Sequence, residues 1–339
     1  MLFIQEEVVE MTEKIYDLTI IGGGPVGIYG AFYAGMHGMT TKIIDALPEL
    51  GGQLAALYPE KYIYDLPGHP KIKAGEMIEQ LKIQMEQFKD KIDIVTNTNV
   101  QTVEKLDDGT FKICTDKECH YSRSIIITAG NGAFTPRKLE IENVNEFSNI
   151  HYFVSQMETF KGKDVVIFGG GDSAVDWALM LDGVAKNVTI VHRRDEFRAH
   201  ASSVENLKNS NVEVLTPYVA KGLSGENGCV TSVELTNVTT NESKMIHTDE
   251  VIVLYGFISS LGPIKEWDLE LNKNALCVNH YQQTSINGIF AAGDACTFEG
   301  KIKMITTGFG EVVVAINAAI AYAYPEKVHR HKHSSAMMK

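Results

Sequence analysis

Two glycine-rich turns carry the chemistry that is easiest to recognise in this sequence. Residues 22–27 (GGGPVG) and residues 169–174 (GGGDSA) each follow a short apolar run. In both, G-x-G-x-x-(G/A) leads from a strand into a helix, which places a pyrophosphate against the N–H groups of the helix N-terminus. The pattern predicts two dinucleotide sites in one chain. The candidate residues of the turns are Gly22, Gly24 and Gly27 in the first, and Gly169, Gly171, Ser173 and Ala174 in the second.

The residue that ends the next strand distinguishes the two sites. It is Asp45 after the first turn and His192 after the second, each 21 positions beyond the middle glycine. An aspartate there accepts hydrogen bonds from ribose hydroxyls. His192 is instead followed by Arg193, Arg194 and Arg198, and guanidinium groups match the oxygens of a 2′-phosphate. The second site is therefore predicted to prefer NADPH over NADH.

Two features near the C-terminus indicate a flavin at the first site. Asp294 ends an apolar strand in residues 289–294 (IFAAGD), where its carboxylate is placed to bind ribitol hydroxyls; the alternative is a helix cap. Residues 306–310 (TTGFG) precede a long apolar helix expected at about residues 310–322. The positive end of that helix would stabilise charge that develops on the pyrimidine end of a flavin during reduction.

These residues must be positioned by two βαβ units, one inserted into the other. The expected elements are a strand at 18–21, a helix at 25–37 and a strand at 41–45, and then a strand from 163, a helix at 173–181 and a strand at 187–192. We expect an α/β fold with two Rossmann-like domains of three layers (ββα). The outer domain comprises residues 1–130 and 255–339, and the inner domain residues 131–254. Gly130, Gly132 and Gly256 flank the crossings and suit a hinge.

Composition excludes several classes of function. The 339 residues, 44% of them hydrophobic, suffice for two cores. A net charge of −12 argues against nucleic acid and anionic membranes as partners. No apolar stretch approaches the roughly 20 residues of a membrane span. The acidic first 14 residues lack the basic and apolar order of a secretory signal, so we expect a cytoplasmic protein.

The five cysteines are odd in number and scattered, which is typical of reduced cytosolic thiols rather than a disulfide framework. Cys114 and Cys119 are separated by four residues, and no histidine-rich partner completes a metal site. We therefore expect structural or incidental roles for all five thiols, and no bound metal.

The motifs together resemble the two-dinucleotide flavoprotein reductases of the thioredoxin reductase type. The segments that carry the resemblance are residues 22–27, 51–53 (GGQ), 128–130 (TAG), 169–174, 192–194 (HRR) and 293–294 (GD), in that order along the chain. The resemblance covers about residues 15–335. It implies that the outer domain binds FAD and the inner domain NADP(H).

One departure from that pattern separates the chain from the disulfide reductases. Thioredoxin reductases carry Cys-x-x-Cys just before the inner glycine turn, whereas residues 151–158 (HYFVSQME) contain no cysteine. The bacillithiol disulfide reductases carry a cysteine within the first turn, where this chain has Val26. Without such thiols there is no route for thiol–disulfide exchange. The whole chain is similar to the remaining branch, the ferredoxin (flavodoxin)–NADP⁺ reductases of the thioredoxin-reductase type.

That resemblance implies a set of FAD contacts. They are Asp45, Gln53, Tyr58, Val100, Phe134, Asp294 and a hydroxyl in the tail, Ser335. Tyr58 would stack on one face of the isoalloxazine, and His333 would cover the other from the partner subunit of a homodimer. His329 and His331 compete with His333 for that role.

The implied reaction needs no protein acid, base or nucleophile. After a rotation of the inner domain that lets the nicotinamide and the flavin stack, NADPH would deliver a hydride to flavin N5, and the reduced flavin would release electrons singly to ferredoxin or flavodoxin. Such carriers are generally acidic, so a local basic patch must overcome the net charge. The candidates are Lys301, Lys303, Lys327, Arg330, Lys332 and Lys339.

Two other functions stay open. One is an NADPH-dependent disulfide or quinone reductase of the same architecture. The other is a flavin redox sensor that reports the NADPH level through a protein interface, which predicts slow turnover with every acceptor.

Overall fold

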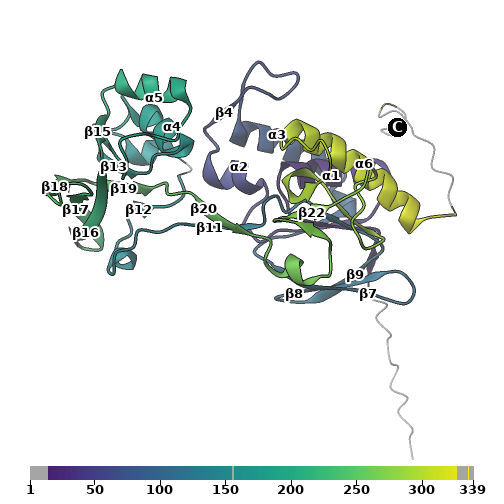
Figure 1. Ribbon diagram of the computed structural model, residues 1–339. Helices are drawn as coiled ribbons and strands as arrows, with labels where there is room; N and C mark the ends of the chain where they lie inside the picture. Colours follow the sequence, from purple (N-terminus) through teal and green to yellow (C-terminus); the bar gives the residue numbers. More distant parts are fainter. Residues whose placement is uncertain (1–13, 155, 327–334, 336–339) are drawn as a thin grey trace, which may run out of the picture. The chain divides into compact units, whose positions relative to one another are not determined.

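The computed structural model describes residues 14–154, 156–326 and 335. Their contacts divide the chain into two compact units (Figure 1). Unit 1 contains the described residues up to Ala55, Lys61–Ala133, and those from Ser260 onward, and unit 2 contains Ala56–Glu60 and Phe134–Ser259. The chain passes between the units through β11 (Ala133–Pro136) and β20 (Phe257–Ser260), which pair with each other in a two-stranded sheet.

Unit 1 has three layers, with a parallel sheet between a second sheet and a layer of helices (Figure 1). The parallel sheet has the order β23 (Ile289–Ala291), β10 (Ile125–Ile127), β2 (Leu18–Ile21), β3 (Thr41–Ile44) and β6 (Ile92–Val95). The second sheet has the order β1 (Ile15–Tyr16), β9 (Cys119–Ser122), β8 (Phe111–Thr115) and β7 (Val100–Lys105). The helices are α1 (Pro25–Met36), α3 (Ala74–Glu86) and α6 (Ile305–Ala323).

Alternating side chains along the parallel strands bind these layers together, as the period of two in a strand requires. Ile21 and Ile125 pack in one buried cluster with Phe111 of β8. Ile20 faces the opposite way, toward Gly30 of α1. The shorter elements of unit 1 are the first four residues of α2 (Gly52–Leu57), the hairpin of β4 (Tyr62–Ile63) and β5 (Ile72–Lys73), and the small sheet of β21 (Leu271–Asn272), β22 (Ala275–Cys277) and β24 (Cys296–Thr297).

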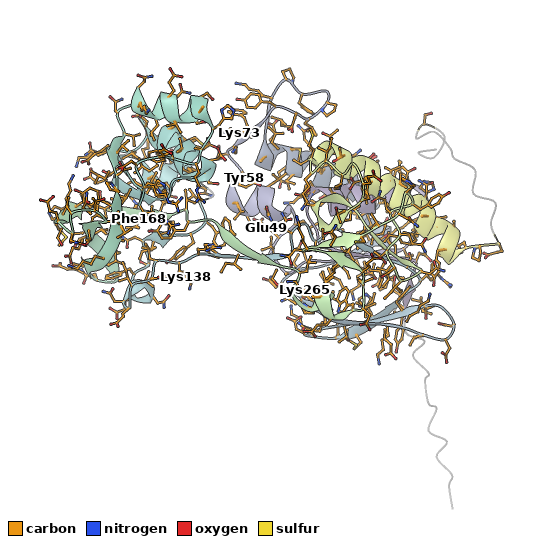
Figure 2. All side chains as sticks on the ribbon, in the orientation of Figure 1. Glu49, Tyr58, Lys73, Lys138, Phe168 and Lys265 are labelled. Carbon is orange, nitrogen blue, oxygen red and sulfur yellow. A yellow bond between two sulfur atoms is a disulfide. The ribbon has the colours of Figure 1, made fainter. Side chains whose placement is uncertain are left out.

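Unit 2 repeats this layering. Its parallel sheet has the order β12 (Ile150–His151), β19 (Glu250–Val253), β13 (Asp164–Phe168), β14 (Asn187–Val191) and β15 (Glu213–Leu215). The antiparallel sheet comprises β16 (Tyr218–Glu226), β17 (Cys229–Asn237) and β18 (Ser243–His247), and the helices are α4 (Asp172–Leu181) and α5 (Ala201–Lys208). Ile167 packs with Trp177 of α4, and its neighbour Phe168, labelled in Figure 2, packs with Val233 of β17.

The two parallel sheets share one strand order around their centres. In each, the strand that leads into a glycine turn (β2 or β13) lies between the strand that follows its helix (β3 or β14) and a strand from later in the chain (β10 or β19). The carboxyl end of such a central strand is where ligands bind in open α/β sheets. The predicted α/β fold with two Rossmann-like units of three layers is confirmed.

The expected start of α6 was wrong. The helix begins at Ile305, so residues 306–310 lie inside it rather than before it. Its start is fixed by a capping box between Met304 and Thr307, and Gly308 is accommodated because α6 packs there against Val26, which leaves no room for a side chain. Over the described residues, α6 is also the one helix long and apolar enough to span a membrane by length and composition, with 39% of that window buried.

Candidate functional site

The first glycine turn, residues 22–27, is so tightly packed that only glycine fits at its last position, Gly27. An ideal Cβ on Gly27 would lie 2.0 Å from the carbonyl oxygen of Gly22, so helix α1 approaches the end of β2 with only a hydrogen between them. The Thr128 hydroxyl donates to the same Gly22 oxygen at 2.6 Å. The turn is therefore held from both α1 and the neighbouring strand β10.

The middle glycine of the turn leaves room for a ligand. A Cβ on Gly24 would meet nothing within 4 Å, and Gly24 is the N-cap residue of α1 with no side-chain cap. The N–H groups of the first helical turn have no intrahelical partner and favour an anion. This open position beside unpaired donors fits the pyrophosphate of a dinucleotide.

Asp45 lies directly beyond β3 and contacts the turn. Its Oδ2 accepts a hydrogen bond from the Gly23 N–H at 2.5 Å, and its Oδ1 accepts one from the Leu47 N–H at 2.7 Å. Burial raises the pKa of this carboxyl, and the two backbone donors partly offset that effect. The carboxylate is therefore fixed in place at the edge of the turn, with lone pairs left for further donors.

Two later segments of unit 1 lie against the same turn. The Gly51 N–H donates to the Gly23 oxygen at 2.8 Å, and a Cβ on Gly52 would lie 3.0 Å from the Gly24 Cα. A Cβ on Gly293 would lie 3.2 Å from the Val26 side chain. The predicted residues Gln53 and Asp294 directly follow these segments. Asp294 is half-buried, and among the described residues no group donates to its carboxylate.

The second glycine turn, residues 169–174, repeats the first with one difference. A Cβ on Gly171 would again meet nothing within 4 Å, so the open position recurs at the N-cap of α4. The last position holds Ala174, which is fully buried, where the first turn tolerates only glycine. Ser173 is exposed in the first turn of α4. The second turn therefore has the same room for a phosphate and a less tightly packed helix.

His192 occupies the acid position of the second site as a neutral ring. It stacks on Phe197 with ring centroids 5.3 Å apart, and it fills the space beside Gly170, whose Cβ would lie 2.3 Å from the ring. Burial lowers the pKa of His192, and the neighbouring arginines lower it further. Arg193, Arg194 and Arg198 are exposed, and the Arg198 N–H donates to the Gly170 oxygen at 2.7 Å, which brings this loop onto the turn.

Comparison with known proteins places this arrangement in a family. The model of the family described as pyridine nucleotide-disulphide oxidoreductase matches residues 16–319. The chain belongs to this family.

Similar relatives of this oxidoreductase extend over nearly its whole length. It is 54% identical over 326 residues to a protein named ferredoxin--NADP reductase from Geobacillus thermodenitrificans, covering 96% of this chain and 98% of the relative. It is 55% identical over 331 residues to a ferredoxin--NADP reductase 2 from Bacillus cytotoxicus, covering 96% and 100%. Among solved structures, thioredoxin reductase from Lactococcus lactis aligns with a TM-score of 0.73 at 26% identity, covering 91% of this chain and 99% of that one.

The remaining predicted site residues of this oxidoreductase are less closely grouped. Val100 is buried in the core at the start of β7, and Tyr58, labelled in Figure 2, is half-buried just after α2. Phe134 lies in β11. Ser335 is exposed, and His333 lies outside the described residues.

Two predictions about individual residues were wrong. Cys114 and Cys119, expected as reduced thiols, form a disulfide, because β8 and β9 pair in a register that sets them directly opposite each other. Lys301, expected on a docking surface, has a side chain only 5% exposed, because it forms an ion pair with Glu311. Lys303 is exposed, and the tail candidates Lys327, Arg330, Lys332 and Lys339 lie outside the described residues.

Sequence reasoning also missed Glu311. Its signal is a lone acid in an apolar helix, four and eight residues before the buried Ala315 and Ala319 on the same helical face.

The closed first turn predicts an asymmetry between the two sites. Gly27→Ala forces a methyl group onto the Gly22 oxygen and should destabilise the protein by about 1–3 kcal/mol, as overpacking does. Ala174→Gly, the matched change in the second turn, should cost at most about 1 kcal/mol. Denaturant unfolding of the two variants and the parent measures both; equal stability of all three would contradict the described packing of α1 on β2.

Proposed function

We propose that this chain is an FAD-dependent oxidoreductase that passes electrons between NADPH and a one-electron carrier, ferredoxin or flavodoxin. FAD binds at the first glycine turn and NADP(H) at the second. The proposal rests on the pair of glycine turns. Both have an open middle glycine, but the first has the carboxylate of Asp45 beside it and the second has arginines. The relatives named ferredoxin--NADP reductase, at 54–55% identity, support the choice of carrier.

The residues present fit FAD at the first turn. The space at Gly24 and the free donors of α1 suit the pyrophosphate, and Asp45 suits ribose hydroxyls. Gln53 and Asp294, whose segments both contact the turn, suit the rest of the cofactor. Bound FAD would supply the conversion between hydride and single-electron transfer. The protein's own task is to bind and orient the cofactor and to exclude water.

The residues of the second turn fit NADP(H). Gly171 gives the pyrophosphate room, and Arg193, Arg194 and Arg198 are exposed beside it. His192 removes the negative charge that would repel a 2′-phosphate, and because its pKa is lowered it does so as a neutral spacer.

The cysteines support direct transfer to a carrier rather than to a thiol substrate. The disulfide lies on β8 and β9 in unit 1, whereas the dithiol of thioredoxin reductases would precede the second turn, at residues 151–158. The free thiols in the described chain are Cys229, Cys277 and Cys296, and burial raises the pKa of Cys277 and of Cys296, the latter to about 12. Neither of these two is a ready thiolate.

Further parts of the proposal rest on the resemblance alone. They are stacking of Tyr58 and His333 on the flavin, contacts of Val100, Phe134 and Ser335 with FAD, a homodimer that supplies the tail from the partner subunit, and a cytoplasmic location. The carrier would dock near Lys303 and the basic tail. Light scattering of the full chain tests the dimer, and salt inhibition of carrier reduction tests the docking site.

The direct test follows the absorbance of the purified protein. It should show a flavin spectrum that bleaches with NADPH and recovers on addition of oxidised ferredoxin. A C114S/C119S variant should recover at the rate of the parent protein, because the disulfide is not on the electron path. Two results would favour a disulfide reductase. In one, C114S/C119S keeps its flavin but no longer reduces ferredoxin; in the other, the parent protein reduces thioredoxin or small disulfides instead of ferredoxin.

The arginines predict the coenzyme preference. In an R193A/R194A variant, KM for NADPH should rise by about 10- to 100-fold, the loss expected for charged hydrogen bonds to phosphate. KM for NADH should change less than about twofold, because NADH has no 2′-phosphate. Steady-state kinetics with both coenzymes measures the ratio. K186A, which removes an exposed lysine paired with Asp164 on the same unit, serves as the control. An equal rise in KM for both coenzymes would show that the arginines do not bind the 2′-phosphate.

Asp45 predicts a pH dependence of FAD retention. Its pKa in the folded protein is raised, so the folded state takes up this proton and the stability due to this group is lost as pH rises through the raised pKa. Acid therefore does not unfold the protein through Asp45, but it neutralises the carboxylate that binds the ribose. FAD release should accelerate on acidification, starting above the usual pKa range of aspartate. In D45N release should be fast at every pH; an unchanged pH profile in D45N would exclude this role.

A further inference from the structure

A buried ion pair lies beside the Asp294 segment. Lys301 Nζ is 2.5 Å from both carboxylate oxygens of Glu311, and the two side chains are 5% and 8% exposed. Taking two charges out of water is costly, and proteins tolerate it where further hydrogen bonds complete the pair. The partners that complete this pair therefore indicate what it does.

The completing partners are the two backbone groups of a single residue, Gly293. Its N–H donates to Glu311 Oε2 at 2.8 Å, and its carbonyl oxygen accepts from Lys301 Nζ at 2.9 Å. Gly293 has a φ of +75°, in the left-handed region, and it precedes Asp294. Two charged side chains thus fix both peptide groups that flank this left-handed glycine.

A thiol completes the enclosure. Cys296 Sγ is 3.4 Å from the Gly293 oxygen and 3.8 Å from Glu311 Oε2 and from Lys301 Nζ. Burial raises its pKa to about 12, so the sulfur is a neutral donor that adds no charge of its own to the ion pair. Removal of Glu311 would leave the buried Gly293 N–H without its acceptor and the buried Lys301 ammonium without its counter-ion, with only the Gly293 carbonyl left to accept from it.

We propose that Lys301 and Glu311 are positioning residues for FAD, which hold the Gly293 turn so that Asp294 presents its carboxylate to the flavin. The proposal rests on the proposed function, in which Asp294 binds FAD. Displacements near 1 Å are enough to weaken a positioned contact strongly. The pair connects α6, through Gly293, to the side of the first glycine turn, where Gly293 contacts Val26.

The test compares FAD release from purified holoenzymes. K301M/E311M removes both charges and leaves no unpaired ion, so it should fold, release FAD about tenfold faster or more, and show altered visible circular dichroism of the bound flavin. E311Q keeps the shape of the side chain and should show the same changes to a smaller extent. K221M, which breaks the exposed Lys221–Glu234 pair of unit 2, should match the parent.

Each outcome decides the proposal. Far-UV circular dichroism of the same samples reports the fold. If K301M/E311M is folded, with parental FAD release and flavin spectrum, the proposal is wrong; if it does not fold, the same result in E311Q decides against it. FAD release from a D294A variant distinguishes failure of the positioning role from failure of the proposed function. A parent protein without FAD refutes the proposed function, whereas fast release in D294A with parental release in the pair variants refutes only the positioning role.

Discussion

The close approach of α1 to the end of β2 is the constraint on which the first site depends. Because no side chain fits between Gly27 and the Gly22 oxygen, the helix starts directly over the strand and its free N–H groups lie at the carboxyl edge of the sheet. The surrounding contacts follow from this position: Thr128 holds the turn from β10, and Asp45 and Gly51 bond to its second residue. Distant parts of the sequence are thereby brought to one end of one strand.

The second site uses the same geometry with a different charge. Asp45 is fixed by two backbone donors, whereas His192 stacks on Phe197 and stays neutral at the equivalent position. A carboxylate beside a 2′-phosphate would repel it, and a neutral ring with exposed arginines does not. In the proposed function, selectivity between the two dinucleotides would depend on this one position and the loop that follows it, while both turns offer the same open middle glycine.

Much of this could be predicted from the sequence, because the information was local. The helix expected at residues 25–37 is Pro25–Met36, and the strand expected at 187–192 is Asn187–Val191. Glycine spacing and apolar runs within a few residues determine these elements. The start of α6 was missed because Gly308 and Gly310 lower helix propensity, and only packing against Val26 explains why Gly308 lies inside the helix.

The other errors were non-local. The Cys114–Cys119 disulfide depends on the register of β8 with β9. No turn motif in the sequence predicted that register. Lys301 was predicted to be a surface lysine because its ion-pair partner, Glu311, is ten residues further along the chain and lies inside α6, which begins between them. In both cases the type of each residue was evident from the sequence, but its neighbours in the fold were not.

The insertion of one unit into the other has a consequence for biosynthesis. Residues 134–259 are continuous, so every strand of the sheet around the second turn has been made by the time residue 259 leaves the ribosome. The sheet of unit 1 still lacks its edge strand β23 at that moment, and the Gly293 turn does not yet exist. Since domains fold as units during synthesis, the nascent chain completes unit 2 first, and a cofactor held between the first glycine turn and the Gly293 turn, as proposed for FAD, would be fully enclosed only near the end of translation.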